Sequence, residues 1–180
     1  MASKNIVVIT GSPRPGGNSD ILADAFIEGA VESGNTVLRF NAGRMDIRPC
    51  KACGYCLEHE GKCVCKDDMD SVYEALYKAD MVVFASPIYW YGFTAQIKAA
   101  IDRFFVCAAR PFPVKATALL AAYEDSDTTV AEPIIAHFKA FTGYLHWENK
   151  GILAEGRVNA KGDINGRKVL TDARNLGLNC

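Results

Sequence analysis

Two kinds of hydrophobic pattern alternate along the chain. Five short segments are rich in apolar or β-branched residues: Asn5–Thr10, Thr36–Phe40, Met81–Ser86, Ala116–Tyr123 and Leu145–Leu153. The first, third and fourth are almost continuous apolar runs, which is typical of strands covered on both faces of a sheet. We therefore predict five β-strands.

The segments between these strands have apolar residues at helical spacing. Five helices are predicted: Ser19–Ser33, Asp68–Ala79, Ala95–Phe105, Thr129–Thr142 and Gly166–Leu178. Thr94 directly precedes the third, where its hydroxyl can cap the free N–H groups of the first turn. Strands that alternate with helices predict an α/β fold with a parallel sheet and right-handed crossovers. At 180 residues, one domain (1–180) is expected.

Three unusual segments follow the first three predicted strands. These are a glycine-rich loop after Thr10, a long cysteine-rich loop at 41–66 and an aromatic loop that begins at Pro87. In open α/β sheets, ligands bind beyond the carboxyl ends of the strands. We expect the three loops to converge on one site at this edge.

Charge and hydropathy exclude several classes of partner. The net charge is −1, which gives no attraction to nucleic acid or to an anionic membrane. No run approaches the roughly 18 apolar residues of a membrane span. The first residues, MASKNIVV, lack the basic and then apolar layout of a signal peptide. A cytoplasmic protein that binds neither nucleic acid nor membrane is expected.

The loop TGSPRPGGNSD is suited to holding an anion. It lies between a strand and a helix, so its backbone N–H groups and the positive end of the helix dipole can face a ligand. Ser12, Asn18 and Ser19 can donate hydrogen bonds, and Arg14 can neutralise charge. The loop matches neither the dinucleotide-binding nor the P-loop spacing of glycines, and a terminal phosphate monoester fits it best. The alternative is a plain turn followed by a helix cap.

Tyr89, Trp90 and Tyr91 stand in a row just after the third strand. Three consecutive aromatic residues cannot all enter a core, so some must line a cleft or the surface. Pro87 stiffens the entry to this loop, and Gly92 allows close approach of the backbone. A flat heteroaromatic ring fits such a loop, whereas local packing or a subunit interface is the alternative.

Five of the seven cysteines lie between Cys50 and Cys65. The spacing is C-x2-C-x2-C-x6-C, and Cys65 is a fifth, spare residue. Four thiolates in one compact loop can bind an iron–sulfur cluster. Three other interpretations are possible: a zinc site, a thiol–disulfide pair such as Cys53 and Cys56, or a remnant of a metal site that no longer binds metal.

These motifs resemble the NADPH-dependent FMN reductase family of flavodoxin-like proteins. GSPRPGGNS and SPIYWYG, followed by QIKAAIDRF, carry the resemblance, which covers roughly residues 1–125. It implies a flavodoxin-like three-layer sandwich with strand order 2-1-3-4-5, bound FMN and NAD(P)H as co-substrate. It assigns the FMN phosphate to Ser12, Arg14, Asn18 and Ser19. It assigns the isoalloxazine and ribityl chain to Pro87, Ile88, Tyr89, Trp90, Gly92, Ala122 and Tyr123.

The cysteine loop is similar to that of iron–sulfur flavoproteins, a branch of the same family. By this resemblance, the ligands of a 4Fe-4S cluster would be Cys50, Cys53, Cys56 and Cys63. Family members are usually dimers or larger, so a homodimer or tetramer is expected.

The expected activity is that of an FMN-dependent NAD(P)H oxidoreductase. No side-chain nucleophile with an obvious base is present, as is usual where a cofactor performs the chemistry. The electron acceptor is expected to be a quinone, a flavin or another small molecule. The alternative is an iron–sulfur flavoprotein that carries electrons between FMN, a cluster and a ferredoxin-like partner. Asp102 and Arg103 are expected to form a structural or interface ion pair rather than to act in catalysis.

Overall fold

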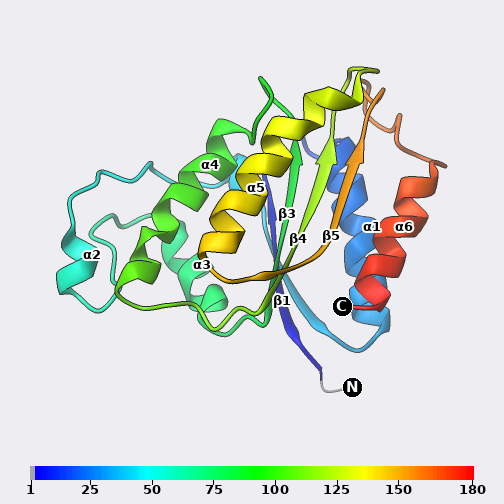
Figure 1. The fold of residues 1–180 in the computed structure, drawn as a ribbon. Helices are drawn as coiled ribbons and strands as arrows, with labels where there is room; N and C mark the ends of the chain where they lie inside the picture. The colour runs from blue at the N-terminus through cyan, green and yellow to red at the C-terminus, as the bar shows by residue number, and fades with distance from the viewer. Residues whose placement is uncertain (1–2) are drawn as a thin grey trace.

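Five parallel strands form the central sheet of the computed structural model, which describes residues 3–180. They are β1 (Asn5–Thr10), β2 (Thr36–Phe40), β3 (Met81–Pro87), β4 (Ala116–Ala122) and β5 (Glu148–Glu155). Their order is β2-β1-β3-β4-β5 (Figure 1). The flavodoxin-like topology expected from the sequence is confirmed.

Helices cover both faces of the sheet. α1 (Asn18–Glu32) and α6 (Lys168–Leu178) lie together on one face, and α3 (Met69–Leu76), α4 (Ala95–Asp102) and α5 (Glu132–Tyr144) cover the other (Figure 1). α1 and α6 touch through their backbones at two glycines. A Cβ at Gly29 would lie 2.0 Å from the Arg174 carbonyl oxygen, and one at Gly177 would lie 2.1 Å from that of Phe26.

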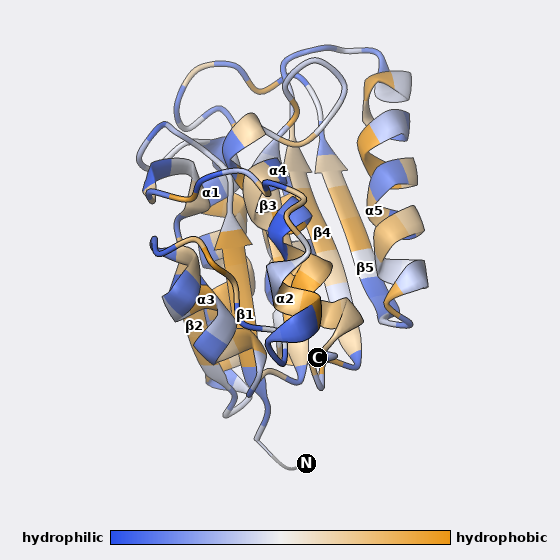
Figure 2. Ribbon diagram, turned by 90° about the vertical axis from the view of Figure 1, so that its left-hand side faces the viewer, coloured by the Kyte–Doolittle hydropathy of each residue, from blue (hydrophilic) through white to orange (hydrophobic). Residues whose placement is uncertain are grey.

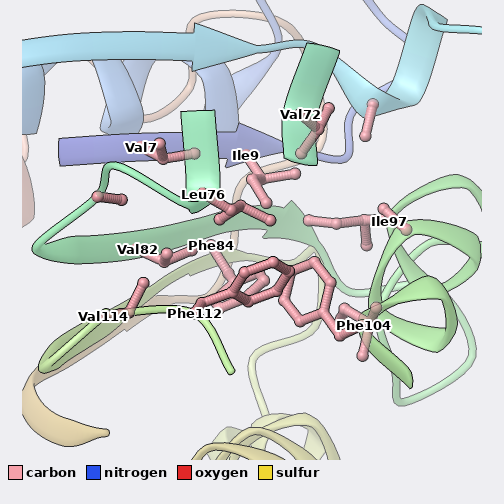
Figure 3. Packing of buried hydrophobic residues seen from close by; sticks show 14 of the residues in the cluster. Val7, Ile9, Val72, Leu76, Val82, Phe84, Ile97, Phe104, Phe112 and Val114 are labelled. Carbon is pink, nitrogen blue, oxygen red and sulfur yellow. The ribbon is translucent and has the colours of Figure 1, made fainter. Parts of the chain in front are cut away.

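Alternate residues of the buried strands enter two separate cores. Val7 and Ile9 face α3, α4 and α5, whereas Ile6 and Val8 face α1 and α6. This is the two-residue period of a strand buried on both faces, and the strands are correspondingly hydrophobic (Figure 2). Phe84 lies at the centre of the first core (Figure 3), where several aromatic rings meet it edge to face.

The fifth strand begins three residues later than predicted. Leu145 caps α5, and His146 has a φ of +58°, which breaks the extended conformation. Trp147 N–H still donates to the Thr142 carbonyl at the end of α5 (3.0 Å). The apolar residues that made this segment look like a strand instead pack the turn between α5 and β5.

The predicted helix after Thr94 changes geometry along its length. Thr94 caps α4 as expected, because its hydroxyl accepts a hydrogen bond from the Ile97 N–H (3.5 Å). From Arg103 to Ala108 the chain continues as a 3₁₀ helix. A short helix that was not predicted, α2 (Tyr55–Glu58), lies in the cysteine loop, at the far side of the molecule from α6 (Figure 1).

Candidate functional site

The loop between β1 and α1 is held in shape by close backbone contacts. Ser12 Oγ accepts a hydrogen bond from the Arg14 N–H (3.2 Å) and donates one to the Arg14 carbonyl (3.0 Å). Gly16 has a φ of +64°, which side chains rarely adopt. At Gly43, a Cβ would lie 2.2 Å from the Ser12 carbonyl oxygen. The segment after β2 therefore packs directly against this loop, which we call the anion loop (residues 11–17).

A cavity of about 200 Å³ opens beside the anion loop, at the carboxyl edge of the sheet. Three predicted segments line it: the start of α1, the end of β3 and the end of β4. The predicted residues brought together there are Ser12, Arg14, Asn18, Ser19, Pro87, Ile88, Tyr89, Ala122 and Tyr123. Trp90 and Gly92 are not part of its wall. The cysteine loop is absent from it as well, so the expectation of three convergent loops is wrong for that loop.

The polar groups at the anion-loop end of this cavity suit a negatively charged ligand. Ser19 is 2% exposed, and its Oγ has no hydrogen-bond partner within residues 3–180. The Arg14 side chain forms neither an ion pair nor a hydrogen bond within the same residues. Asp20 lies nearby, but its Oδ1 is 2.8 Å from Arg39 Nη2, so its charge is compensated. An unsatisfied buried hydroxyl and a free guanidinium at the start of a helix fit a phosphate group.

Asn18 has a different role from the neighbouring residues. Its Nδ2 donates to the Ala160 carbonyl (2.9 Å), and its Oδ1 accepts from the N–H groups of Gly162 (3.0 Å) and Ile164 (3.4 Å). The side chain therefore ties the start of α1 to the loop after β5. Direct contact between Asn18 and a phosphate remains a prediction.

The aromatic loop forms a tight turn in an uncommon conformation. Tyr89 and Gly92 exchange two backbone hydrogen bonds, both 3.1 Å long. Trp90 and Tyr91 occupy the two central positions with φ values of +45° and +65°. Asn and Gly usually occupy such positions, because a side chain there costs free energy. Trp90 is 95% exposed, which leaves a large aromatic surface directly after Tyr89 of the cavity wall.

Tyr123 closes the cavity on the β4 side. This residue is 6% exposed. Burial raises the pKa of the phenol, and the carboxylates of Glu155, Asp127 and Asp125 raise it further. The hydroxyl therefore stays protonated at neutral pH and can serve as a hydrogen-bond donor.

Sequence reasoning did not assign the loop after β5 to the site. Val158, Asn159 and Lys161 of this loop line the cavity. The signal that could have found them is topological, because the loop follows the carboxyl end of the last parallel strand. No motif marks it.

The cysteine loop is a closed loop with a narrow neck. Asp46 N–H donates to Asp68 Oδ2 (2.8 Å), and Asp68 N–H donates to the Asp46 carbonyl (3.0 Å). Arg48 N–H donates to Asp67 Oδ2 (3.1 Å). The two ends of the loop are therefore clasped, with the cysteines between them.

A buried ion pair anchors this neck. Arg103 Nη1 lies 2.9 Å from Asp67 Oδ2 and also donates to the Arg48 carbonyl (2.9 Å). Burial by itself raises the pKa of Asp67, but the hydrogen bonds from Arg103 and Arg48 outweigh it and lower the pKa. Arg103 thus has the structural role expected of it, but with Asp67 rather than with its neighbour Asp102, which pairs with Lys98.

The predicted cysteine ligands line one small cavity, separate from the first. Cys50, Cys53, Cys56 and Cys63 all contribute to its wall, together with Cys65 and the buried Arg103. Burial raises the pKa of the Cys56 thiol, and the nearby Cys63, Cys50 and Cys53 raise it further. Ala52 N–H donates to Cys50 Sγ (3.5 Å).

The cysteine cavity has the donor chemistry of an iron–sulfur site but not its finished geometry. Within residues 3–180, no three His, Cys, Asp or Glu side chains are close enough together to hold a metal ion. The cavity itself, at about 20 Å³, has room for roughly one water molecule. The thiols must therefore move inward before they can share a cluster.

A parallel sheet of this order, with an anion loop after β1 and an aromatic loop after β3, defines a flavodoxin-like protein. The family model of NADPH-dependent FMN reductases matches residues 4–146, and the chain belongs to that family.

Similar proteins fall into two groups. Over 110 residues the chain is 37% identical to an iron–sulfur flavoprotein of Methanosarcina thermophila, across 61% of this chain and 57% of the relative. The matches to the iron–sulfur flavoproteins thus span about half of their length. The chain is also 31% identical, over 88% of both proteins, to YwqN of Bacillus subtilis, provisionally named as an NAD(P)H-dependent FMN-containing oxidoreductase.

Among solved structures, the NAD(P)H:quinone oxidoreductase from Methanothermobacter marburgensis superposes with a TM-score of 0.76. It covers 99% of this chain and 96% of its own, at 22% identity. This likeness supports the fold. Within residues 3–180, no helix is both long enough and apolar enough to cross a bilayer.

Proposed function

We propose that the protein is an FMN-dependent NAD(P)H oxidoreductase, with FMN bound in the cavity beside the anion loop. The observation that carries this proposal is one cavity lined by both Ser19 and Arg14 in a chain of the FMN reductase family. Within residues 3–180, the buried Ser19 Oγ has no hydrogen-bond partner and Arg14 has no ion pair. Bound FMN supplies hydride transfer from NAD(P)H and electron transfer to a quinone, a flavin or another small acceptor.

The chain's own residues bind and orient the cofactor. Ser12, Arg14 and Ser19 would hold the phosphate, while the ribityl chain would run between α1 and the ends of β3 and β4. Pro87, Ile88 and Tyr89 would flank one edge of the ring, and Ala122 and Tyr123 the other. Trp90 and Tyr91 would cover the open side, where a nicotinamide can approach.

A titration tests this proposal. We expect the purified protein to quench FMN fluorescence with a stoichiometry of one per chain. The complex should then lose its blue absorption when NADH or NADPH is added without oxygen. If neither FMN nor riboflavin binds, the proposal is wrong.

The cysteine cavity favours a second candidate, an iron–sulfur flavoprotein that passes electrons to a ferredoxin-like partner. Four cysteines around one cavity and the names of several relatives support it. Anaerobic reconstitution should then yield about four iron and four sulfide per chain in the wild type. Cys56→Ser should lose both, whereas Cys180→Ser, outside the loop, should retain them. Iron-free protein that still oxidises NAD(P)H rapidly would support the first candidate alone.

A further inference from the structure

We propose that Lys161 is a second cation of the phosphate site and that Asn18 holds it there. Together they would select a phosphate monoester, so that FMN binds in preference to riboflavin and FAD. This inference rests on the proposed function and adds to it a residue from the last third of the chain.

Lys161 lies against the anion loop. A Cβ built on Gly16 would be 3.0 Å from Lys161 Nζ and 3.1 Å from its Cε. Lys161 lines the same cavity as Arg14 and Ser19. Within residues 3–180 its ammonium group forms no ion pair, in contrast to Lys98, Lys150 and Lys168. Two cationic side chains, Arg14 and Lys161, therefore line this cavity without an ion pair to any residue of 3–180.

The loop that carries Lys161 is fixed by its own hydrogen bonds. Asp163 Oδ2 accepts from the N–H groups of Asn159 (2.9 Å) and Ala160 (2.8 Å). Arg167 Nε donates to the Asp163 carbonyl (3.0 Å). Ile164 is fully buried in the core beneath α1 and α6. Lys161 is therefore presented by a folded loop.

Asn18 joins this loop to the first turn of α1. It is 9% exposed and bonds to both sides of Lys161 in the sequence, at Ala160 and at Gly162. Its side chain thus sets the distance between the lysine and the anion loop. Asn18 acts here as a positioning residue.

The local charges match a dianion. FMN ends in a phosphate monoester that carries close to two negative charges, whereas riboflavin carries none. Each phosphate group of FAD has one ester and one anhydride bond and carries a single charge, and its adenylate continues past the point that Lys161 would cover. Of the nearby acids, Asp20 is paired with Arg39. Asp163 accepts hydrogen bonds from two backbone N–H groups of its own loop. Glu124 lines the cavity from the β4 side, so one carboxylate faces the two cations across the cavity. The family match ends at residue 146, so this loop lies beyond it.

The first test is Lys161→Met, with Lys139→Met as the matched control. Both lysines are exposed, and Lys139 lies on α5, outside the cavity wall. We expect Lys161→Met to weaken FMN binding about 10- to 100-fold, as for a charge-assisted hydrogen bond, and to leave riboflavin affinity unchanged. The preference for FMN over FAD should fall, and FMN affinity should depend less on salt. Lys139→Met should bind all three flavins as the wild type does.

Equal FMN affinity in Lys161→Met and wild type would overturn this inference while leaving the proposed function intact. A wild type that binds no flavin would instead remove the proposed function itself.

A double-mutant cycle tests the role of Asn18. If Asn18 acts by placing Lys161, Asn18→Ala should weaken FMN binding in the wild type but change it less than twofold in the Lys161→Met background. Equal losses in the two backgrounds would mean that Asn18 acts independently of Lys161, and would refute the positioning role.

Discussion

Arg103 and Asp67 form an ion pair that is almost completely removed from solvent. Their Nη1 and Oδ2 atoms are 2.9 Å apart, and the side chains are 1% and 0% exposed. The pair joins the end of α4 to the neck of the cysteine loop. The position of the cysteine loop therefore depends on the folding of the whole domain.

Removing one partner of this pair should be costly. Asp67→Asn would leave a buried guanidinium without its counter-charge, and we expect the free energy of unfolding to fall by about 3–5 kcal/mol. Asp102→Asn is the matched control, because Asp102 pairs with Lys98 on the surface and should contribute only about 0.3–0.5 kcal/mol. Urea denaturation at pH 7 measures both. A loss below 1 kcal/mol in Asp67→Asn would contradict the prediction.

The same pair predicts a pH dependence of stability. The pKa of Asp67 is lower in the folded protein than in the unfolded chain, so the unfolded chain binds more protons between the two values. The stabilisation is complete above the unfolded pKa of about 4 and is lost as the pH falls through the folded value. Denaturation series between pH 2 and 6 should show a shallower acid slope in Asp67→Asn than in the wild type.

The contact between α1 and α6 should not tolerate a side chain at Gly29. A Cβ there would meet the Arg174 carbonyl at 2.0 Å, and neither backbone can yield without moving a helix. We expect Gly29→Ala to destabilise the protein by about 1–3 kcal/mol. Gly143→Ala on α5 is the control, since nothing lies within 4 Å of its Cβ position. It should stabilise by about 0.5–1 kcal/mol through helix propensity, so thermal melts should shift in opposite directions.

Backbone strain in the aromatic turn predicts that relieving it should stabilise the fold but weaken FMN binding. Tyr91 has a φ of +65°, and Tyr91→Gly should therefore stabilise the fold by about 1 kcal/mol. The same change removes part of the aromatic surface that would cover the isoalloxazine, so FMN affinity should decrease. Thermal melts and fluorescence titration of the same samples measure the two effects. Unchanged FMN affinity would place Tyr91 outside the flavin site.

Arg14 should contribute directly to phosphate binding. Its guanidinium has no partner within residues 3–180, so Arg14→Ala should cost FMN binding about 1–3 kcal/mol without affecting stability. Riboflavin, which lacks the phosphate, serves as the control ligand and should bind both proteins equally. Unchanged FMN affinity would remove Arg14 from its assigned role.

Local sequence patterns were enough to predict most of the strands and the chemical character of the loops. The apolar runs at 6–9 and 81–85 are short, rich in β-branched residues and bounded by polar residues, which favours strands buried on both faces. The glycines, Ser12 and Arg14 indicated an anion loop from the local sequence. Such features can be predicted because the period of apolar positions and the residue types of a turn depend only on residues close together in the sequence. The strand order came from the resemblance of these loops to a family.

The contacts between residues far apart in the sequence became known from the folded chain alone. The Asn18 side chain donates a hydrogen bond to Ala160, 142 positions away. Arg103 forms its ion pair with Asp67 rather than with the adjacent Asp102. The cysteine loop has a cavity of its own rather than a share of the first one. Contacts of this kind depend on how helices and loops pack over the edge of the sheet. The periodicity of apolar residues along the sequence does not predict that packing.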